Sequence, residues 1–428
     1  MRTTYQITEY GSFISGKEVP GYTTLPENTF SQLEAFILSN KSRDTDALEF
    51  LGLSAKKGLG KVITARNYVG IITMKDGTSI EILPKVYSGE AYTDTMVKKL
   101  LIDMLKCLRN TPYKALQTST VNIEKMSVFE VFVRMFVDEV FNIVKRGLRQ
   151  YYEAVEDNCG EYKGKILFSE HIKRNYAHKE RCYVEFDDYN CNRPENKLLK
   201  ATLQYLNMQS QSSLNKRDIK TLLNAFADVE PSTDHNSDFQ KCSLDRNMKD
   251  YATALLWCKV FLSGKSFTSF SGSEVALALL FPMETLFESY VAVRLKKILG
   301  TTDFLVVAQD RSYHLFDYPN NKFLMKPDIV VHRKRDNSTF ILDTKWKILS
   351  SGKSNYGISQ SDMYQMYAYH KKYAAANVCL LYPKAESILS ETPIHFRSKD
   401  EVQVGIEFID LFKLDESLLN IKLALNAG

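Results

Sequence analysis

The stretch of sequence that most constrains the fold runs from Lys326 to Lys347, KPDIVVHRKRDNSTFILDTKWK. Two short apolar segments, DIVVH and TFILDTKW, flank a polar turn, and this pattern predicts a β-hairpin. Because side chains alternate between the two faces of a strand, Asp343 and Lys345 are expected to point the same way. Pairing of the two strands brings Asp328, at the mouth of the first strand, beside Asp343.

This hairpin predicts a metal site. Two facing carboxylates repel each other unless a cation lies between them, and hard oxygen ligands suit Mg²⁺ or Mn²⁺. A lysine ammonium beside such a metal can orient or deprotonate a water, while the metal stabilises charge on a phosphate oxygen. The expected chemistry is therefore hydrolysis of a phosphodiester bond. The alternative is a surface hairpin whose charged side chains are solvated.

An acid-x-lysine triplet is not specific by itself. The sequence contains three others, at Glu161–Lys163, Glu195–Lys197 and Asp218–Lys220. None of these has an apolar strand before the acid or a Pro-Asp segment upstream. The order Pro-Asp, apolar strand, Asp-x-Lys at 327–345 resembles the signature of the PD-(D/E)xK nucleases.

Length and composition set broad limits. A chain of 428 residues exceeds what one hydrophobic core usually organises, so two or three domains are expected. The net charge of +5 permits nucleic-acid binding without requiring it. The first ten residues contain no apolar core of the signal-peptide type, and no run of eighteen apolar residues occurs. We therefore expect a cytoplasmic protein without a membrane segment.

Neither a zinc site nor a nucleotide site is predicted. The seven cysteines are scattered and none forms a C-x-x-C pair, which favours reduced structural thiols. Gly264-Lys265-Ser266 resembles the end of a P-loop, but the required first glycine would fall at Lys259. If nucleotide hydrolysis drives the work of this protein, another chain must supply it.

Residues 1–150 are expected to begin as a β-rich region and then to become helical. Two apolar runs around Asp76-Gly77 predict a hairpin, and short helices are expected at 30–38 and 47–53. From 93 to 150, apolar residues recur three and four positions apart, which predicts buried helices that extend to the Tyr151-Tyr152 pair.

Residues 151–273 are expected to form a mainly helical middle region, with a short helix at 166–176 and an alternating strand at 181–189. Its segment 230–246 is rich in turn-forming residues and predicts an exposed polar excursion, in which His235 is a solvated loop residue. The Ser/Gly-rich segment 263–273 predicts a hinge before the last domain.

Two basic segments allow two interpretations each. SAKKGLGK at 54–61 is either a solvated turn or a contact for a partner or a phosphate. The helix end at Lys145, Arg146 and Arg149 either touches nucleic acid or places cations at the negative end of the helix dipole.

Residues 274–428 are expected to form the last domain. It begins with a helix whose apolar stripe spans 283–295, with Glu284 and Glu288 four residues apart on a neighbouring face. Beside the hairpin, strands are expected at 303–309, 378–382 and 404–411, and an aromatic-rich helix at 361–376. This order predicts a small α/β sandwich. The fold class of the whole chain is therefore α/β, in an α+β multidomain arrangement.

Four ordered motifs carry a family resemblance: FPMETLFESYV at 281–291, KPDIVV at 326–331, LDTKWK at 342–347 and DMYQMYAY at 362–369. Upstream segments add to it: EILPK at 81–85, RGLRQYYE at 146–153 and NRPENKLLK at 192–200. Together they resemble the McrC family, the nuclease subunits of modification-dependent McrBC-type restriction systems.

The resemblance implies a C-terminal PD-(D/E)xK endonuclease domain. In it, Asp328 and Asp343 are metal ligands and Lys345 is the catalytic lysine. Glu288 matches the acid that many of these enzymes add to the metal shell, although pairing with Glu284 on a solvated face is the alternative.

Gln365 and Tyr369 match the Q-x-x-x-Y helix of RecB-like nucleases, which helps to place the scissile strand. Simple core packing is the alternative for Tyr369. Trp346, which alternation turns away from Lys345, is expected to belong to the core.

The resemblance also implies partners. These are a hexameric AAA+ GTPase resembling McrB, which binds the GTP and receives the amino-terminal half of the chain in its pore, and double-stranded DNA with modified cytosine. Two alternatives stay open: a catalytically inert scaffold that activates the GTPase of the ring, and a stand-alone repair nuclease.

Overall fold

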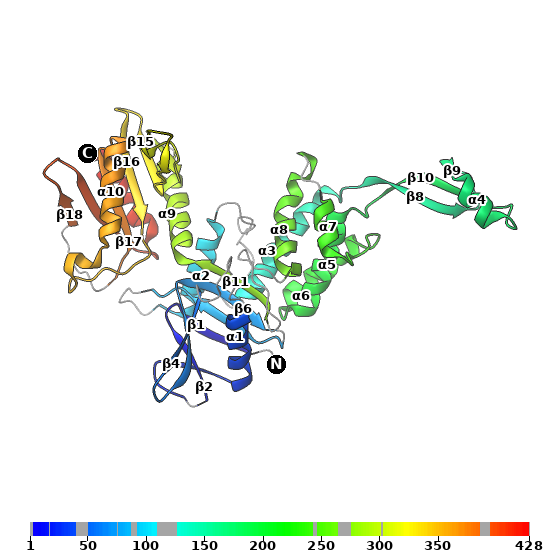
Figure 1. Ribbon diagram of the computed structural model, residues 1–428, viewed down its shortest axis with the longest axis horizontal. Helices are drawn as coiled ribbons and strands as arrows, with labels where there is room; N and C mark the ends of the chain where they lie inside the picture. Colours follow the sequence, from blue (N-terminus) through cyan, green and yellow to red (C-terminus); the bar gives the residue numbers. More distant parts are fainter. Residues whose placement is uncertain are drawn as a thin grey trace. The chain divides into compact units, whose positions relative to one another are not determined.

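The computed structural model describes residues 3–16, 18–39, 50–74, 76–86, 92–108, 126–242, 246–263, 275–300, 303–385 and 394–427 (Figure 1). The chain divides into two compact units. Met1–Val128 and Ser266–Gly428 together form the first unit, and Phe129–Lys265 form the second. The two ends of the sequence therefore fold together, whereas the sequence suggested three consecutive domains at 1–150, 151–273 and 274–428.

Strand pairing explains why the last part of the chain joins the first. β11 (Val275–Pro282) pairs antiparallel with β6 (Tyr68–Met74), so it completes the sheet of order β1-β7-β6-β11. Backbone groups of an edge strand need partners, and β11 supplies them to β6. The segment at 264–274, where we expected a hinge, lies outside the described residues.

The amino-terminal part contains two four-stranded sheets. One is β1-β7-β6-β11 and the other is β3-β2-β5-β4. The hairpin predicted around Asp76-Gly77 is confirmed, because β6 and β7 pair antiparallel on either side of it. The remaining elements are β1 (Thr4–Thr8), β2 (Ser12–Ser15), β3 (Thr23–Leu25), α1 (Glu27–Ser39), β4 (Leu51–Lys56), β5 (Gly60–Ala65), β7 (Ser79–Leu83) and α2 (Asp94–Lys106).

One expectation for this part was wrong. The described end of the segment 47–53 is not helical, because Leu51 begins β4, whose backbone pairs antiparallel with β5. The SAKKGLGK segment contains a solvated turn at 57–59, as one interpretation held, and its ends belong to these two strands. Lys56 Nζ lies 3.1 Å from the Tyr22 hydroxyl, so this lysine contacts the protein itself.

The second unit contains a helical bundle. α3 (Val128–Arg146) belongs to it rather than to the amino-terminal part, because Phe132 and Phe136 pack against Trp257 and Phe261. The other elements are α5 (Pro194–Gln209), α6 (Ser213–Ala225), α7 (His235–Lys241), η4 (Arg246–Tyr251) and α8 (Ala252–Ser263). The expected excursion at 230–246 thus contains the short helix α7, while 243–245 lie outside the described residues.

The sequence analysis missed a sheet in this unit. α3 ends at Arg146 instead of running to Tyr152, and Gly147 follows with a φ of +85°, a conformation that commonly ends helices. Arg146 forms an ion pair with Asp250 at 2.6 Å. The chain then enters β8 (Tyr151–Cys159), which pairs antiparallel with β10 (Cys182–Asn190).

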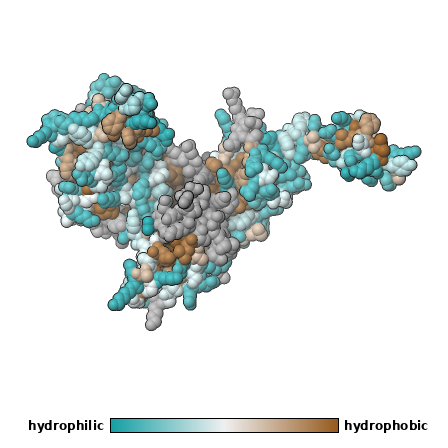
Figure 2. Space-filling model, viewed as in Figure 1, coloured by the Kyte–Doolittle hydropathy of each residue, from teal (hydrophilic) through white to brown (hydrophobic). Residues whose placement is uncertain are grey.

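We call β8, β9 (Lys165–Ile166), α4 (Phe168–Asn175) and β10 the arm (Figure 1). It extends away from the helices of its own unit. Apolar residues gather near its far end in the space-filling view (Figure 2), where Phe168 and Ile172 are 69% and 66% exposed. The arm therefore has little core of its own.

The carboxy-terminal part is built on a six-stranded sheet of order β12-β15-β16-β17-β19-β18. α10 packs on one face, where Met366, Tyr369 and Tyr373 join the sheet core. The other elements are α9 (Met283–Leu299), β12 (Phe304–Ala308), β13 (His314–Phe316), β14 (Lys322–Leu324), β15 (Ile329–Arg333), β16 (Ser338–Thr344), η5 (Ser354–Gly357), α10 (Gln360–Tyr373), β17 (Asn377–Pro383), β18 (Ile394–Arg397), β19 (Gln403–Ile409) and α11 (Leu414–Ala427). The predicted order of helices and strands is confirmed here.

Two general expectations can be compared with the whole described chain. All seven cysteines are free thiols, as expected. Within the described residues, none of the helices combines the length and the apolar character needed to cross a bilayer.

Candidate active site

The predicted hairpin is present and forms the centre of the site. β15 and β16 pair antiparallel with Ile329 opposite Leu342, so Asp328 and Asp343 are the next residues outward in the same register. On its other side β16 pairs parallel with β17, which places Asp343 opposite Leu380. The two aspartates therefore lie at the ends of neighbouring interior strands, on the face that α10 covers.

The Asp343 carboxylate is almost completely buried. It is 1% exposed, and its Oδ2 atom lies 2.5 Å from Lys345 Nζ in an ion pair. The pKa of Asp343 is raised to about 7, because burial and then the neighbouring Asp328 carboxylate raise it while Lys345 opposes both. The protein groups around Asp343 therefore do not fully stabilise the negative charge of its ionised form.

The Asp328 carboxylate is fixed by the next residue of β16. Its Oδ2 atom accepts hydrogen bonds from the Thr344 backbone N–H at 2.7 Å and from the Thr344 hydroxyl at 2.6 Å. Burial raises the pKa of Asp328, and the two bonds from Thr344 oppose this effect. Thr344, which the sequence analysis did not single out, therefore orients one member of the carboxylate pair.

Lys345 connects the carboxylates to α10. Its Nζ atom donates to Gln365 Oε1 at 3.2 Å and lies 3.8 Å from Asp362 Oδ1. Burial lowers the pKa of Lys345, but the ion pair with Asp343 outweighs burial, so the pKa is raised overall. The ammonium form is therefore favoured in the folded chain.

Gln365 and Tyr369 lie on one face of α10, as their spacing predicted. Gln365 Nε2 donates to the Tyr369 hydroxyl at 2.9 Å. Tyr369 is only 3% exposed, and burial raises the pKa of its hydroxyl. The ring of Tyr369 therefore packs in the core, and its hydroxyl ends a chain of contacts that begins at Lys345. A role in placing the scissile strand stays a prediction.

Glu288 lies beside the segment that carries Asp328 but does not join the two aspartates. Its Oε1 atom accepts from Gln309 Nε2 at 2.8 Å, and the Gln309 backbone N–H donates to the Asp328 carbonyl at 2.8 Å. Glu284 instead accepts from Asn67. Across the described residues, no three His, Cys, Asp or Glu side chains gather into a metal site. The role of Glu288 as a metal ligand stays a prediction.

The residues nevertheless fit a divalent cation. Mg²⁺ commonly binds to proteins through only one or two carboxylates, with water and substrate phosphate completing its shell. Asp328 and Asp343 supply two carboxylates, and Asp343 Oδ2 is a buried oxygen without a hydrogen bond. A hard cation would compensate the burial that raises the pKa of both carboxylates and the repulsion from Asp328 that raises the pKa of Asp343.

Three residues of the site escaped the sequence analysis: Asp362, Thr344 and Gln309. A helical signal could have identified Asp362, because it lies three residues before Gln365 on the same face of α10. Gln309 carried no such signal. It has a left-handed φ of +53°, and it connects Asp328 to Glu288 through its backbone N–H and its side chain.

Trp346 faces away from Lys345, as alternation predicted. Its ring lies 5.4 Å from the ring of Phe287, centroid to centroid, and its indole N–H points to Glu9. The sequence analysis expected only core packing for Trp346 and did not predict its hydrogen bond to Glu9, the residue after β1.

Comparisons with known proteins agree with this architecture. A family model described as McrBC 5-methylcytosine restriction system component matches residues 63–383. Among curated proteins, none matches the chain.

Two solved structures are similar. The first is a refined half-complex from a tetradecameric assembly of Thermococcus gammatolerans McrB AAA+ hexamers with bound McrC; identity is 19%, the TM-score is 0.68, and the match covers 99% of this chain and 100% of that one. The second, the cryo-EM structure of the Thermococcus gammatolerans McrBC complex, has 18% identity and a TM-score of 0.48 over 68% of this chain and 86% of that one. The first likeness establishes a shared fold.

Proposed function

The chain belongs to the family of McrBC 5-methylcytosine restriction system components, and on this basis we propose that it is the nuclease subunit of such a system. In this proposal it is a Mg²⁺-dependent or Mn²⁺-dependent endonuclease that hydrolyses phosphodiester bonds of double-stranded DNA, and its carboxy-terminal sheet is a PD-(D/E)xK domain. The observation that carries the proposal is the pairing of the buried Asp343 with the half-buried Asp328 at the ends of neighbouring strands, with Lys345 Nζ at 2.5 Å from Asp343.

Each site residue has a role that its contacts support. Asp328 and Asp343 would hold the cation, and Thr344 fixes the orientation of Asp328 through two hydrogen bonds. The bound metal would supply stabilisation of negative charge on the phosphate. Glu288, held by Gln309, would enter the metal shell only through a side-chain rearrangement.

Lys345 would act as an ammonium group. Its raised pKa favours the charged form, which suits it to orient the attacking water and to stabilise charge on the phosphate. Gln365 holds this ammonium by a hydrogen bond, and Tyr369 holds Gln365 in turn. α10 would thus set the position of the lysine relative to the scissile strand.

The proposal includes a ring-shaped partner, a McrB-like hexameric AAA+ GTPase. Two observations support it: the similar solved structure is described as McrB AAA+ hexamers with bound McrC, and the sequence lacks the first glycine of a P-loop at Lys259. GTP would accordingly be bound by the partner, and DNA with 5-methylcytosine would be the substrate. The site of action would be the cytoplasm.

A reconstitution experiment tests the proposal. The full chain is mixed with its AAA+ partner, GTP, Mg²⁺ and DNA with 5-methylcytosine, and DNA cutting and GTP hydrolysis are measured separately. Wild type should cut, and Asp343→Ala should stimulate GTP hydrolysis without cutting. Stimulation without cutting by wild type would instead favour the inert scaffold, and cutting by the single chain would favour a stand-alone nuclease.

A further inference from the structure

A carboxylate from the other end of the chain binds the residue that follows Lys345. The Trp346 indole N–H lies 3.0 Å from Glu9 Oε1 and 3.1 Å from Glu9 Oε2. Glu9 directly follows β1, and its backbone N–H donates to the Leu83 carbonyl at 2.9 Å. This contact therefore joins the sheet β1-β7-β6-β11 to the strand that carries the candidate active site.

The surroundings of Glu9 are those of a specific contact. The side chain is 0% exposed, and its Oε1 atom also accepts from the Lys85 backbone N–H at 3.0 Å. Burial raises the pKa of Glu9 to about 7, and the bonds from Lys85 and Trp346 oppose this rise. A buried carboxylate that receives mainly neutral donors costs stability compared with an apolar residue. The protein keeps this destabilising carboxylate where it contacts Trp346, just beyond the strand that carries Asp343.

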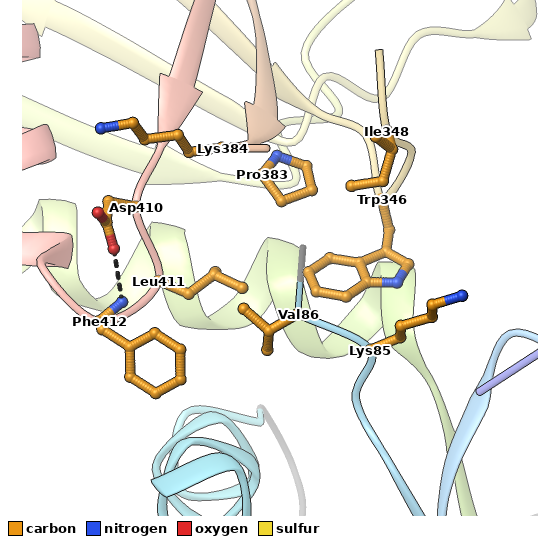
Figure 3. A pocket seen from close by; sticks show the side chains of 9 residues that line it. All are labelled: Lys85, Val86, Trp346, Ile348, Pro383, Lys384, Asp410, Leu411 and Phe412. Atoms are coloured by element: carbon orange, nitrogen blue, oxygen red, sulfur yellow. Dashed lines mark hydrogen bonds between the residues drawn. The ribbon is translucent and has the colours of Figure 1, made fainter. Parts of the chain in front are cut away.

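The strand geometry explains what the contact can do. Beyond β16, the Lys345 backbone N–H still donates to the Leu381 carbonyl at 2.9 Å, so Lys345 is the last residue that this sheet neighbour holds. Trp346 comes next, with its side chain on the opposite face. Figure 3 shows its indole beside Val86, in a small pocket that Pro383 and Leu411 also line.

We propose that Glu9 is a positioning residue of the nuclease site, which holds the Trp346 indole and thereby fixes the backbone that presents Lys345 and Asp343. This inference rests on the proposed function. It makes the amino-terminal sheet an integral support of the site, although that sheet contributes no residue to the carboxylate pair. Small displacements of a catalytic group lower the rate strongly, so a loosened Trp346 should act on catalysis rather than on DNA binding.

Kinetics in the full reconstituted complex test this role. Glu9→Ala should lower kcat for cutting by about tenfold with KM for DNA unchanged. Glu9→Gln retains a carbonyl acceptor for the indole and should restore kcat to within about threefold of wild type. Trp346→Phe keeps the ring beside Phe287 but removes the donor, and in combination with Glu9→Ala it should cause no further loss.

Glu81→Ala is the matched control. Glu81 is also 0% exposed and lies in the same sheet, but its carboxylate binds the Val128 backbone N–H and Lys98 Nζ, each at 2.7 Å. Glu81→Ala should lower thermal stability, because it leaves the Lys98 ammonium and the Val128 N–H without this acceptor, but kcat should be unchanged. An unchanged kcat in Glu9→Ala, or an equal loss in Glu81→Ala, would overturn the inference.

Fluorescence gives a readout that does not depend on cutting. The chain has two tryptophans, so the spectrum of Trp346→Phe can be subtracted to isolate Trp346. Its emission should change with pH around 7 in wild type and not in Glu9→Gln, with Lys85 and Glu284 as the other charges that act on Glu9. An identical pH response in Glu9→Gln would show that Glu9 does not hold the indole.

The two failures are distinguishable. A wild type that does not cut under any condition refutes the proposed function, and the positioning role falls with it. A wild type that cuts, together with a Glu9→Ala variant of equal kcat, refutes only the role of Glu9.

Discussion

The strand pair β15–β16 and the arm both carry an acid-x-lysine triplet, and they differ in what surrounds it. In the strand pair, Asp343 is 1% exposed and lies between two neighbouring strands. In the arm, Glu161 and Lys163 lie in the exposed turn between β8 and β9, and Lys163 Nζ sits 3.5 Å from the ring centroid of Phe186. The same three-residue pattern is thus desolvated in one region and solvated in the other.

The difference changes the electrostatics. Burial raises the pKa of Asp343 to about 7, and a second carboxylate adds to the effect. On the arm, the hydrogen bond from Arg174 holds the pKa of Glu170 below its usual value. Asp343 also has a cationic partner, Lys345, but burial and the facing Asp328 carboxylate outweigh it, so a bound cation is favoured here. The need for a cation therefore arises from burial in the sheet and from the second carboxylate, and not from the three-residue pattern itself.

The largest effect is expected at the carboxylate pair. Asp343→Ala removes a metal ligand and should reduce DNA cutting in the reconstituted complex by at least about a thousandfold. The fold should survive because the substitution also relieves carboxylate repulsion. Glu161→Ala in the arm triplet is the matched control and should cut as wild type does. Equal activity of the two variants would remove the distinction between the regions.

The lysines of the two triplets should differ in the same way. Lys345→Gln keeps a polar group near Asp343 but loses the ammonium, so cutting should fall by about a hundredfold. Lys163→Gln should leave the rate unchanged, since its ammonium lies over the half-buried ring of Phe186 in the arm. Initial rates at saturating DNA measure both. A small effect of Lys345→Gln would show that a group other than Lys345 stabilises the charge on the phosphate.

Of the two triplets, only the one with Asp343 should make the stability of the fold depend on pH. The folded pKa of Asp343 is raised to about 7, so the native chain binds more protons than the unfolded chain from about pH 4 upward. Stability from this group is complete below that pH and is lost as the pH rises through 7. In metal-free buffer, Asp343→Asn should therefore gain about 2 kcal/mol relative to wild type between pH 5 and pH 8.

Thermal or urea unfolding at the two pH values measures this gain, with Glu161→Gln as the control that should show none. If Asp343→Asn were less stable than wild type at pH 8, the carboxylate would be well compensated by protein groups, and the demand for a cation would be absent.

The smallest effect is expected on α10. Tyr369→Phe removes the hydroxyl that accepts from Gln365, two contacts away from the carboxylates, so cutting should fall by only about threefold. Tyr373→Phe is the control on the same helix, because its hydroxyl donates to Asp310 at 3.0 Å rather than to the site. A loss of more than about a hundredfold in Tyr369→Phe would indicate direct contact with substrate.

The sequence predicted the site better than the architecture around it. The hairpin, the alternation that aligns Asp343 with Lys345, and the Gln365–Tyr369 spacing are local patterns, and the structure brings these residues together. The pairing of β11 with β6 and the bond from Glu9 to Trp346 join residues far apart in the sequence. No periodicity encodes such contacts, since they depend on how separate elements pack.

The arm was predicted only in part. The short helix expected at 166–176 and the strand expected at 181–189 correspond to α4 and β10. β8 was missed, because its residues are exposed or half-buried and the strongly apolar α3 before it predicted a longer helix. Pairing of nine residues on each strand stabilises it through backbone hydrogen bonds instead of a core.

Binding of Mn²⁺ to the full chain, followed by electron paramagnetic resonance, tests the central claim most directly. Wild type and Glu161→Gln should each bind Mn²⁺ at a specific site, and Asp343→Asn should lose that site. A wild type without specific binding, or an Asp343→Asn variant that keeps it, would contradict the assignment of Asp328 and Asp343 as the carboxylates that hold a divalent cation.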